Sequence, residues 1–205
     1  MKCPTRGLYA ITQTDNKATQ MIIEEVSAVI RGGASIVQYR AKDLTDKAFL
    51  ANELLKICRD QQVPLIINDD VELAANIGAD GVHLGKDDGS LSEARKVLGA
   101  DAIIGVSCYD NFERALAAQG EGANYVAFGR FFPSLSKPLA APASIETLQK
   151  ARCELAIPIV AIGGILPENG KQLLAAGADL LAVIGGLFAD GQPEQSAQKY
   201  LELFK

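Results

Sequence analysis

Short apolar runs recur along the chain and alternate with longer amphipathic segments. Four of the runs begin with a Gly-Ala pair followed by a polar residue, and they lie at residues 32–40, 78–85, 122–129 and 177–185. The shared glycines are 45, 44 and 55 residues apart, so each interval has room for two units of strand plus crossover helix. Further apolar runs, rich in Ile and Val, lie at residues 7–12, 64–69, 102–107 and 157–164. The pattern therefore predicts eight strands.

The segments between the predicted strands carry the start and stop signals of helices. Capping side chains, or prolines suited to a first helical position, occur at Thr45, Asp110, Ser144, Pro167 and Pro193. Before the next strand the chain reaches Gly78, Gly122 and Gly177, where we expect a left-handed backbone conformation.

Eight strand–helix units with apolar strands predict an α/β fold, a closed (β/α)8 TIM barrel of parallel strands covered by helices. An open doubly wound sheet is the alternative, but it requires neither eight units nor such even spacing. No linker interrupts the pattern, so we expect one domain over residues 1–205.

Composition and charge narrow the class of protein. The 205 residues are 48% hydrophobic and 22% charged, which excludes disorder, and the formal net charge of −5 disfavours nucleic acid as a partner. No apolar run approaches the roughly 18 residues of a membrane span, and the start of the chain lacks a signal-peptide core. We therefore expect a cytoplasmic protein with no membrane partner, while a homo-oligomer remains open.

The sequence assigns no chemistry to the chain's four thiols or to its single imidazole. Cys3, Cys58, Cys108 and Cys153 are far apart and lack metal-ligand spacing, which suits reduced thiols, and Cys108 is expected to be a buried structural residue. His83 faces the barrel interior, where a hydrogen-bonded core histidine and a catalytic one are equally consistent with the sequence.

Polar residues interrupt the apolar pattern where strands end, the rim at which such barrels hold their reactive groups. Alternation puts Gln38 and Arg40 on the barrel side, and Lys42 follows in the loop. Burying these groups is costly unless an anion meets them, although an Arg paired with a barrel carboxylate is the structural alternative.

Two acidic loops follow neighbouring strands at the same rim. Asp69 comes directly after the third strand and Asp88 after the fourth, so together they predict a Mg²⁺ site completed by water and substrate phosphates. The alternative is that these loops are only helix caps and turns, for which Asp and Gly are common.

The remaining strand ends suit phosphate. Ser107 places a hydroxyl at the rim, and Ser134, Ser136 and Lys137 follow the sixth strand. The glycine turns at residues 163–165 and 184–186 follow the last two strands, where this fold commonly binds phosphate through backbone N–H groups. Together with the acidic loops, these features predict two phosphorylated substrates, one a diphosphate with Mg²⁺, and loss of diphosphate as the reaction.

An ordered series of segments resembles the thiamine-phosphate synthase family over residues 7 to 190. The segments are VQYRAKD, INDDVELA, GADGVHLGKDD, GVSCY, FGRFFPSLSKP, AIGGI and AVIGGLF. The resemblance implies a transferase of thiamine biosynthesis. It joins an aminopyrimidine carried as its methyl diphosphate to a thiazole carried as its ethyl phosphate, and it releases diphosphate to give thiamine phosphate.

The resemblance also implies roles for individual residues. Asp69 and Asp88 hold Mg²⁺, the cofactor, and Arg40, Lys42 and Lys137 are catalytic because they stabilise the departing diphosphate. The implied substrate-binding residues are Gln38, Tyr39, Arg40, Ala41, Lys42, Asn68, Ser107, Ser134, Leu135, Ser136, Lys137, Gly164, Ile184 and Gly185. Within that set, Ser107 contacts the pyrimidine, and the residues at 134, 136, 164, 184 and 185 bind the thiazole phosphate.

The chain departs from the family pattern at several positions. Ser134-Leu135-Ser136-Lys137 replaces the common Thr-x-Thr-Lys, and Lys86 and Gly185 stand where Gln and Ser are usual. Tyr109 stands where His often occurs, in the region in which the related thiazole tautomerase uses a His. That isomerase is one alternative function, and a non-catalytic phosphate-binding barrel is another.

Overall fold

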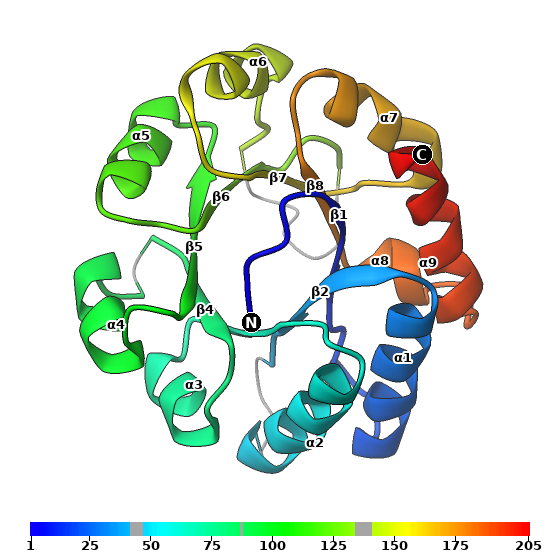
Figure 1. Cartoon of the computed structure of the whole chain (residues 1–205). Coiled ribbons are helices and arrows are strands. Elements are labelled where there is room, and N and C mark those ends of the chain that lie inside the picture. Colours follow the sequence, from blue (N-terminus) through cyan, green and yellow to red (C-terminus); the bar gives the residue numbers. More distant parts are fainter. Residues whose placement is uncertain (42–46, 87, 134–140) are drawn as a thin grey trace.

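The computed structural model describes residues 1–41, 47–86, 88–133 and 141–205. Eight parallel strands pair in the order of the sequence, and the last pairs with the first to close a barrel (Figure 1). The strands are β1 Gly7–Ile11, β2 Ala34–Tyr39, β3 Leu65–Asn68, β4 Gly81–Leu84, β5 Ile103–Tyr109, β6 Tyr125–Gly129, β7 Ile159–Ile162 and β8 Leu180–Val183. The predicted TIM barrel is confirmed, and the open doubly wound sheet is wrong.

Helices surround the barrel and connect its strands (Figure 1). They are α1 Thr19–Arg31, α2 Lys47–Asp60, α3 Val71–Ile77, α4 Leu91–Leu98, α5 Phe112–Gly120, α6 Ile145–Glu154, α7 Pro167–Ala175, α8 Gly185–Phe188 and α9 Pro193–Leu201, followed by a 3-10 turn at Glu202–Phe204. The prolines predicted at first helical positions begin α7 and α9, where the missing N–H costs no helical hydrogen bond.

Capping side chains set the starts of several helices. Ser144 caps α6 as predicted, because its hydroxyl accepts from the backbone N–H of Thr147. The predicted cap at Asp110 is wrong by one residue: Asn111 caps α5, and Asp110 instead accepts from the N–H of Ser144. The third predicted cap, at residue 45, lies outside the described residues.

The glycines that precede strands have positive φ, as predicted. The φ angles of Gly78, Gly122 and Gly177 are 68°, 90° and 116°, values that side chains with a Cβ adopt only at a cost. The chain reverses at these glycines and enters the next buried strand, so the repeat in the sequence marks these reversals.

Two layers of apolar side chains fill the molecule on either side of the sheet. The layer between strands and helices includes Val37 and Tyr39, whereas the barrel interior contains Ile36, Tyr9 and Tyr125. Successive residues of a strand point to opposite faces, which explains why neighbours along β2 belong to different layers. The prediction that residues 37 and 39 face the helices is confirmed.

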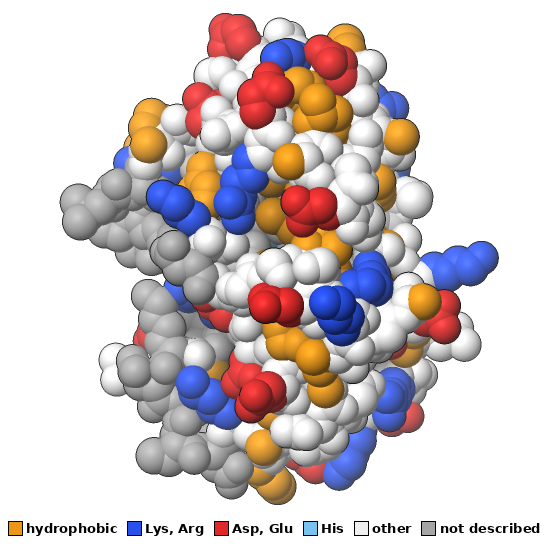
Figure 2. Space-filling view, turned by 90° about the vertical axis from the view of Figure 1, so that its left-hand side faces the viewer, with side chains coloured by type: hydrophobic (Ala, Val, Ile, Leu, Met, Phe, Trp, Pro, Cys, Tyr) orange, Lys and Arg blue, Asp and Glu red, His pale blue; other side chains and the backbone are white. Residues whose placement is uncertain are grey.

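Charged side chains of both signs are interspersed on the outer face shown in Figure 2, with small hydrophobic groups between them. Within the described ranges, no helix combines the length and the apolar character that crossing a bilayer would require.

Candidate active site

The predicted site residues lie at the carboxyl ends of adjacent strands. In the strand register Gln38 pairs with Ile66, Asn68 with His83, and His83 with Gly105, so β2 to β5 end side by side. Residues that are far apart in the sequence therefore share one rim of the barrel, as parallel strands require.

Arg40 directly follows β2, and its backbone is held firmly at the rim. Its N–H donates to Thr12 Oγ1 at 2.9 Å, and its carbonyl accepts from the hydroxyls of Thr12 and Thr14 at 3.2 and 3.3 Å. These bonds join the ends of β1 and β2. The chain therefore presents the half-buried Arg40 from a fixed position.

The other predicted residues around β2 differ in what they can offer. Gln38 is 3% exposed and its amide lies inside the barrel, where Nε2 donates to Tyr9 Oη. The Tyr39 side chain is buried in the layer under the helices, so at the rim this residue offers its backbone alone. Ala41 is half-buried, and Lys42 lies outside the described residues.

The two aspartates that follow β3 have separate tasks. Asp70 caps α3, because its Oδ1 accepts from the N–H of Leu73 at 2.8 Å. Asp69 is exposed and has φ of 66°, a left-handed conformation that Asp tolerates better than most residues. Its Oδ2 accepts from the Asn68 side chain. Helix capping therefore accounts for Asp70 but not for Asp69.

A similar division holds after β4. Ser90 begins α4 and forms a reciprocal capping box with Glu93, a pairing that lowers the pKa of the Glu93 carboxyl. Asp88 instead accepts from the backbone N–H of Gly85 at 2.8 Å. The cap belongs to Ser90, and the Asp88 carboxylate folds back toward the end of β4.

The Asp69 and Asp88 carboxylates approach the same point beside Gly85. A Cβ placed on Gly85 would lie 2.4 Å from Asp88 Oδ2 and 3.9 Å from Asp69 Oδ1. Glycine is needed here because a side chain would occupy the space between the two carboxylates. Two converging carboxylates are the ligand set that Mg²⁺ takes when water and substrate complete its shell. Among the described residues, no group of three or more potential ligands converges.

The loops after β7 and β8 lie next to each other, since Ile162 pairs with Ala182 at the ends of these strands. Gly164 has φ of +63°, and a Cβ there would lie 2.4 Å from the carbonyl oxygen of Pro133. Gly185 is exposed and has open space where a Cβ would be, and Ile184 precedes it with a half-buried side chain.

Asn169 and Tyr200 hold the Gly164 loop in place. Asn169 Nδ2 donates to the carbonyl of Gly164 at 3.0 Å, and the buried Tyr200 hydroxyl donates to the carbonyl of Ile165 at 2.9 Å. The predicted site residues between β6 and α6, residues 134–137, lie outside the described residues.

A buried hydrogen-bond chain that the sequence did not reveal links two of the predicted site residues. Tyr9 Oη lies 2.7 Å from Tyr125 Oη, which lies 3.0 Å from His83 Nδ1. His83 Nε2 lies 2.8 Å from the hydroxyl of Ser107, and Gln38 joins the other end. The sequence does place Tyr9 and Tyr125 at inward positions of otherwise apolar strands, which indicates that their hydroxyls need partners inside the barrel. It does not show which partners, because the stagger of the strands decides which interior side chains meet.

Arg114 is a second functional candidate that the sequence did not reveal. From α5, its Nε donates to the carbonyl of Ser107 at 2.8 Å and its Nη2 to the carbonyl of Gly85 at 3.0 Å. One guanidinium thus ties the loop that carries Asp88 to the end of β5. An arginine in a helix gives no sequence signal for such a role.

Two of the four thiols, those of Cys58 and Cys108, are buried and unsuited to act as nucleophiles. Burial raises the pKa of Cys58 and of Cys108 to about 12, so both remain protonated at neutral pH. The expectation that Cys108 is a buried structural thiol is confirmed by its exposure of 0%.

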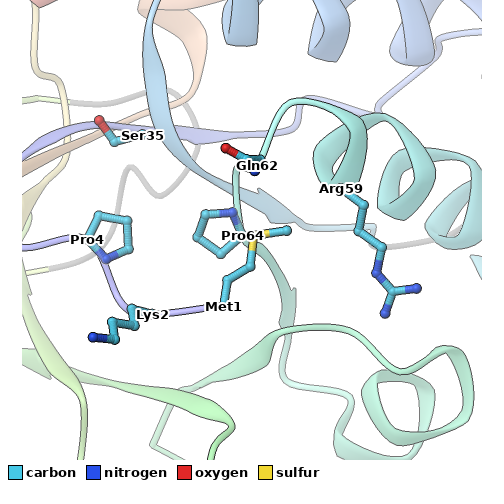
Figure 3. Close-up of a pocket in the computed structure, with 7 residues that line it drawn as sticks. All are labelled: Met1, Lys2, Pro4, Ser35, Arg59, Gln62 and Pro64. Carbon is cyan, nitrogen blue, oxygen red and sulfur yellow. The ribbon is translucent and has the colours of Figure 1, made fainter.

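A cavity lies at the opposite end of the barrel, away from the predicted site residues. It has a volume of about 540 Å³, and Figure 3 shows Met1, Lys2 and Pro4 of the N-terminal segment facing Ser35 and Pro64 at the amino ends of β2 and β3. Met1 is held there by an ion pair between its amino group and Asp80 at 3.1 Å. This cavity is therefore separate from the rim that carries the predicted site residues.

Comparison with known proteins points to one family. Residues 8–187 match the family described as "Thiamine monophosphate synthase". The thiamine-phosphate synthase of Nitrosococcus oceani is 52% identical over 206 residues, which cover 100% of this chain and 95% of the relative. That of Methylococcus capsulatus is 49% identical and covers 98% of this chain and 90% of the relative.

A solved structure agrees with the sequence relatives. The chain superimposes on the thiamine phosphate pyrophosphorylase from Pyrococcus furiosus with a TM-score of 0.87 and 30% identity, over 97% of this chain and 95% of that one.

Proposed function

The chain belongs to the thiamine-phosphate synthase family, and from that premise we propose how its residues carry out the reaction. It is an enzyme with thiamine-phosphate synthase activity, and its substrates are those of that reaction. The alternatives, a tautomerase-like isomerase and a non-catalytic phosphate-binding barrel, lack comparable support, because relatives about half identical over the full chain are synthases. What we propose is the site: the residues, the metal and the order of events.

The observation that carries the proposal is the convergence of Asp69 and Asp88 beside Gly85. Asp69 follows the strand next to the one that Arg40 follows, so the Arg40 side chain and both carboxylates come from the ends of three adjacent strands. This part of the rim would bind the pyrimidine diphosphate, with Asp69 and Asp88 holding Mg²⁺ and with Arg40, Lys42, Asn68 and Lys137 on the diphosphate oxygens. When held by these carboxylates, Mg²⁺ would supply positive charge to the diphosphate oxygens.

The protein's own contribution to bond breaking would be electrostatic. The pyrimidine amino group donates electron density, so the bond between the methylene carbon and the diphosphate oxygen can break before the new bond forms. Arg40, whose backbone is held by hydrogen bonds to Thr12, would stabilise the negative charge that develops on the departing diphosphate. Lys42 and Lys137 are proposed to act on the same charge.

The thiazole phosphate would bind on the opposite side of the rim. Gly164, Ile184 and Gly185 are proposed to bind it together with Ser134 and Ser136. In support, Gly185 leaves open space after β8, and the Gly164 loop is held by Asn169 and Tyr200. Anchoring the phosphate would hold the thiazole nitrogen in line with the methylene carbon. A ring nitrogen attacks with its lone pair, so the reaction needs no general base.

Gln38 and Ser107 are proposed to contact the pyrimidine ring. Both lie near the carboxyl ends of their strands, next to the proposed diphosphate site, and the polar side-chain atoms of both lie where the barrel interior meets the rim. Tyr39 and Ala41 would contribute backbone contacts to the same substrate.

The experiment that tests the proposal mixes both phosphorylated heterocycles with the enzyme and follows thiamine phosphate by chromatography. We expect product with Mg²⁺ and none when a chelator removes it. Equal rates in chelator would contradict the metal site, whereas no product under any condition would contradict the function itself.

A further inference from the structure

Five side chains from five strands form one hydrogen-bond chain through the barrel interior. It runs from Gln38 on β2 to Tyr9 on β1 at 2.8 Å, to Tyr125 on β6 at 2.7 Å, to His83 on β4 at 3.0 Å and to Ser107 on β5 at 2.8 Å. The two ends of the chain are the residues proposed to contact the pyrimidine. The residues between them have no role in the mechanism described above.

The two tyrosines cannot touch a ligand themselves. Tyr9 and Tyr125 are each 1% exposed, and burial raises the pKa of both hydroxyls well above the ordinary value. They therefore stay protonated, and each hydroxyl donates one hydrogen bond. Because a phenol has a single proton, the direction of one bond in the chain fixes the direction of the next.

The surrounding packing holds the chain in one geometry. The His83 ring stacks on Tyr125 at 5.6 Å between centroids with 17° between the planes, and Tyr9 meets Tyr125 edge-on at 5.8 Å. Gly105 makes this arrangement possible, because a Cβ there would lie 1.9 Å from the Tyr125 ring. The rings therefore have no room to turn away from their partners.

The direction follows from the Gln38 amide, whose nitrogen donates to Tyr9. Tyr9 then donates to Tyr125, and Tyr125 donates to Nδ1 of His83. An imidazole that accepts at Nδ1 carries its proton on Nε2, which donates to Ser107. The hydroxyl proton of Ser107 is then free to donate to a ligand at one end of the hydrogen-bond chain, and the Gln38 carbonyl oxygen is free to accept from a ligand at the other end.

We propose that Tyr9, Tyr125 and His83 are positioning residues that make Gln38 a hydrogen-bond acceptor and Ser107 a donor toward the pyrimidine ring, so that the enzyme selects the amino form. The inference rests on the proposed contacts of Gln38 and Ser107 with that ring. An aminopyrimidine offers the complementary pattern, an amino group that donates and a ring nitrogen that accepts. The oxo analogue, with a carbonyl in place of the amino group, offers a carbonyl that accepts and a ring N–H that donates.

A free glutamine could turn its amide to accept the oxo analogue, but Gln38 is not free to do so alone. Turning it would require every bond of the chain to reverse and the His83 proton to move from Nε2 to Nδ1. The chain therefore links the two ends: a ligand that mismatches at Gln38 also mismatches at Ser107.

The first test measures the His83 tautomer directly. His83 is the only histidine of the chain, so the imidazole ¹⁵N signals of the labelled protein need no assignment. We expect a neutral ring with the proton on Nε2. A proton on Nδ1 would overturn the proposed direction.

The second test compares two competitive inhibitors, the aminopyrimidine methyl phosphate and its oxo analogue, by the ratio of their inhibition constants. We expect Tyr9→Phe and Tyr125→Phe to lower the preference for the amino form about tenfold, since one mismatched hydrogen bond is worth that much. The KM for thiazole phosphate should stay the same. His83→Gln, which can both accept and donate, should retain more of the preference than His83→Leu.

Tyr200→Phe is the matched control, because it removes another buried tyrosine hydroxyl that does not belong to the hydrogen-bond chain. It should lower the melting temperature but leave the preference unchanged. Both tyrosine variants could keep the wild-type preference while Gln38→Ala and Ser107→Ala still weaken both inhibitors. That result would overturn the role of the hydrogen-bond chain but leave the proposed contacts of Gln38 and Ser107 in place. Unchanged inhibition in Gln38→Ala and Ser107→Ala would remove the contacts on which it rests, and a wild-type enzyme that forms no thiamine phosphate would contradict the function.

Discussion

Asp69 and Asp70 are neighbours in the chain, yet their side chains have different partners. Asp70 accepts from the first turn of α3, whereas Asp69 is directed toward the space beside Gly85 that it shares with Asp88. A sequence that reads Asn-Asp-Asp cannot show which carboxylate caps the helix. The distinction depends on the left-handed backbone at Asp69, which turns its side chain away from the helix.

This pair gives a matched test. We expect Asp69→Asn to abolish Mg²⁺-dependent diphosphate release with little change in melting temperature, since Asn tolerates the left-handed backbone at this position and the Asp69 carboxylate makes no cap. Asp70→Ala should retain activity but lose about 1 kcal/mol of stability with its cap. Activity assays and thermal unfolding of both variants check this, and loss of activity in Asp70→Ala alone would reverse the assignment.

The cysteines allow a prediction from pKa. An ordinary thiol with a pKa near 8.5 is partly ionised at pH 8, but burial raises the pKa of Cys58 and Cys108 to about 12. The reactive thiolate of these two residues therefore forms only as the pH nears 12. We expect iodoacetamide at pH 8 to label the exposed Cys153 in the native protein and to spare both buried thiols, as measured by peptide mass spectrometry. Rapid labelling of Cys108 would contradict its burial.

At the scale of elements, strands were predictable and contacts between loops were not. The Gly-Ala repeat marks where the chain reverses into four of the strands, and Ile- and Val-rich runs mark the other four, so all eight strands lie where the pattern predicts. The start of α5 was misplaced by one residue because Asp110 and Asn111 are both good caps, and the choice between them depends on the fold around Ser144. The link from Arg114 to two loops was not predictable, because it depends on how α5 packs.

Arg114 is the element-scale residue to change. Arg114→Lys keeps the charge but cannot donate from two fixed nitrogens to the carbonyls of Ser107 and Gly85. We expect a higher Mg²⁺ concentration for half-maximal rate and a loss of about 1–2 kcal/mol in the free energy of unfolding. Arg152→Lys on the outer surface, where the side chain pairs with Asp179, is the control and should change neither. An unchanged Mg²⁺ dependence in Arg114→Lys would show that the two hydrogen bonds of Arg114 do not position Asp88.

The two glycine loops separate backbone strain from ligand contact. Gly164→Ala places a Cβ against the carbonyl of Pro133 at a positive φ, so we expect a raised KM for thiazole phosphate together with a loss of about 1–3 kcal/mol of stability. Gly185→Ala meets open space and should fold like the wild type, so a change in that KM would report on the phosphate contact alone. Equal KM values in both variants and the wild type would remove these loops from the phosphate site.

At the scale of the whole molecule, the barrel brings distant residues to one rim and keeps them away from the cavity beneath Met1. Closure in sequence order places the ends of β2, β3 and β4 side by side, which is why candidate residues from separate segments could be assigned to one site from the sequence. The hydrogen-bond chain inside the barrel could not be predicted, because strand stagger decides which interior side chains meet.

Calorimetric measurement of diphosphate binding tests most directly whether Asp69 and Asp88 together hold a metal beside the diphosphate. We expect the wild-type enzyme to bind diphosphate with Mg²⁺ and to lose that binding in chelator, in Asp69→Ala and in Asp88→Ala, while Asp70→Ala binds like the wild type. Diphosphate binding that is equally strong in chelator, or that survives in both the Asp69 and the Asp88 variants, would contradict a site in which these carboxylates hold the metal beside the leaving group.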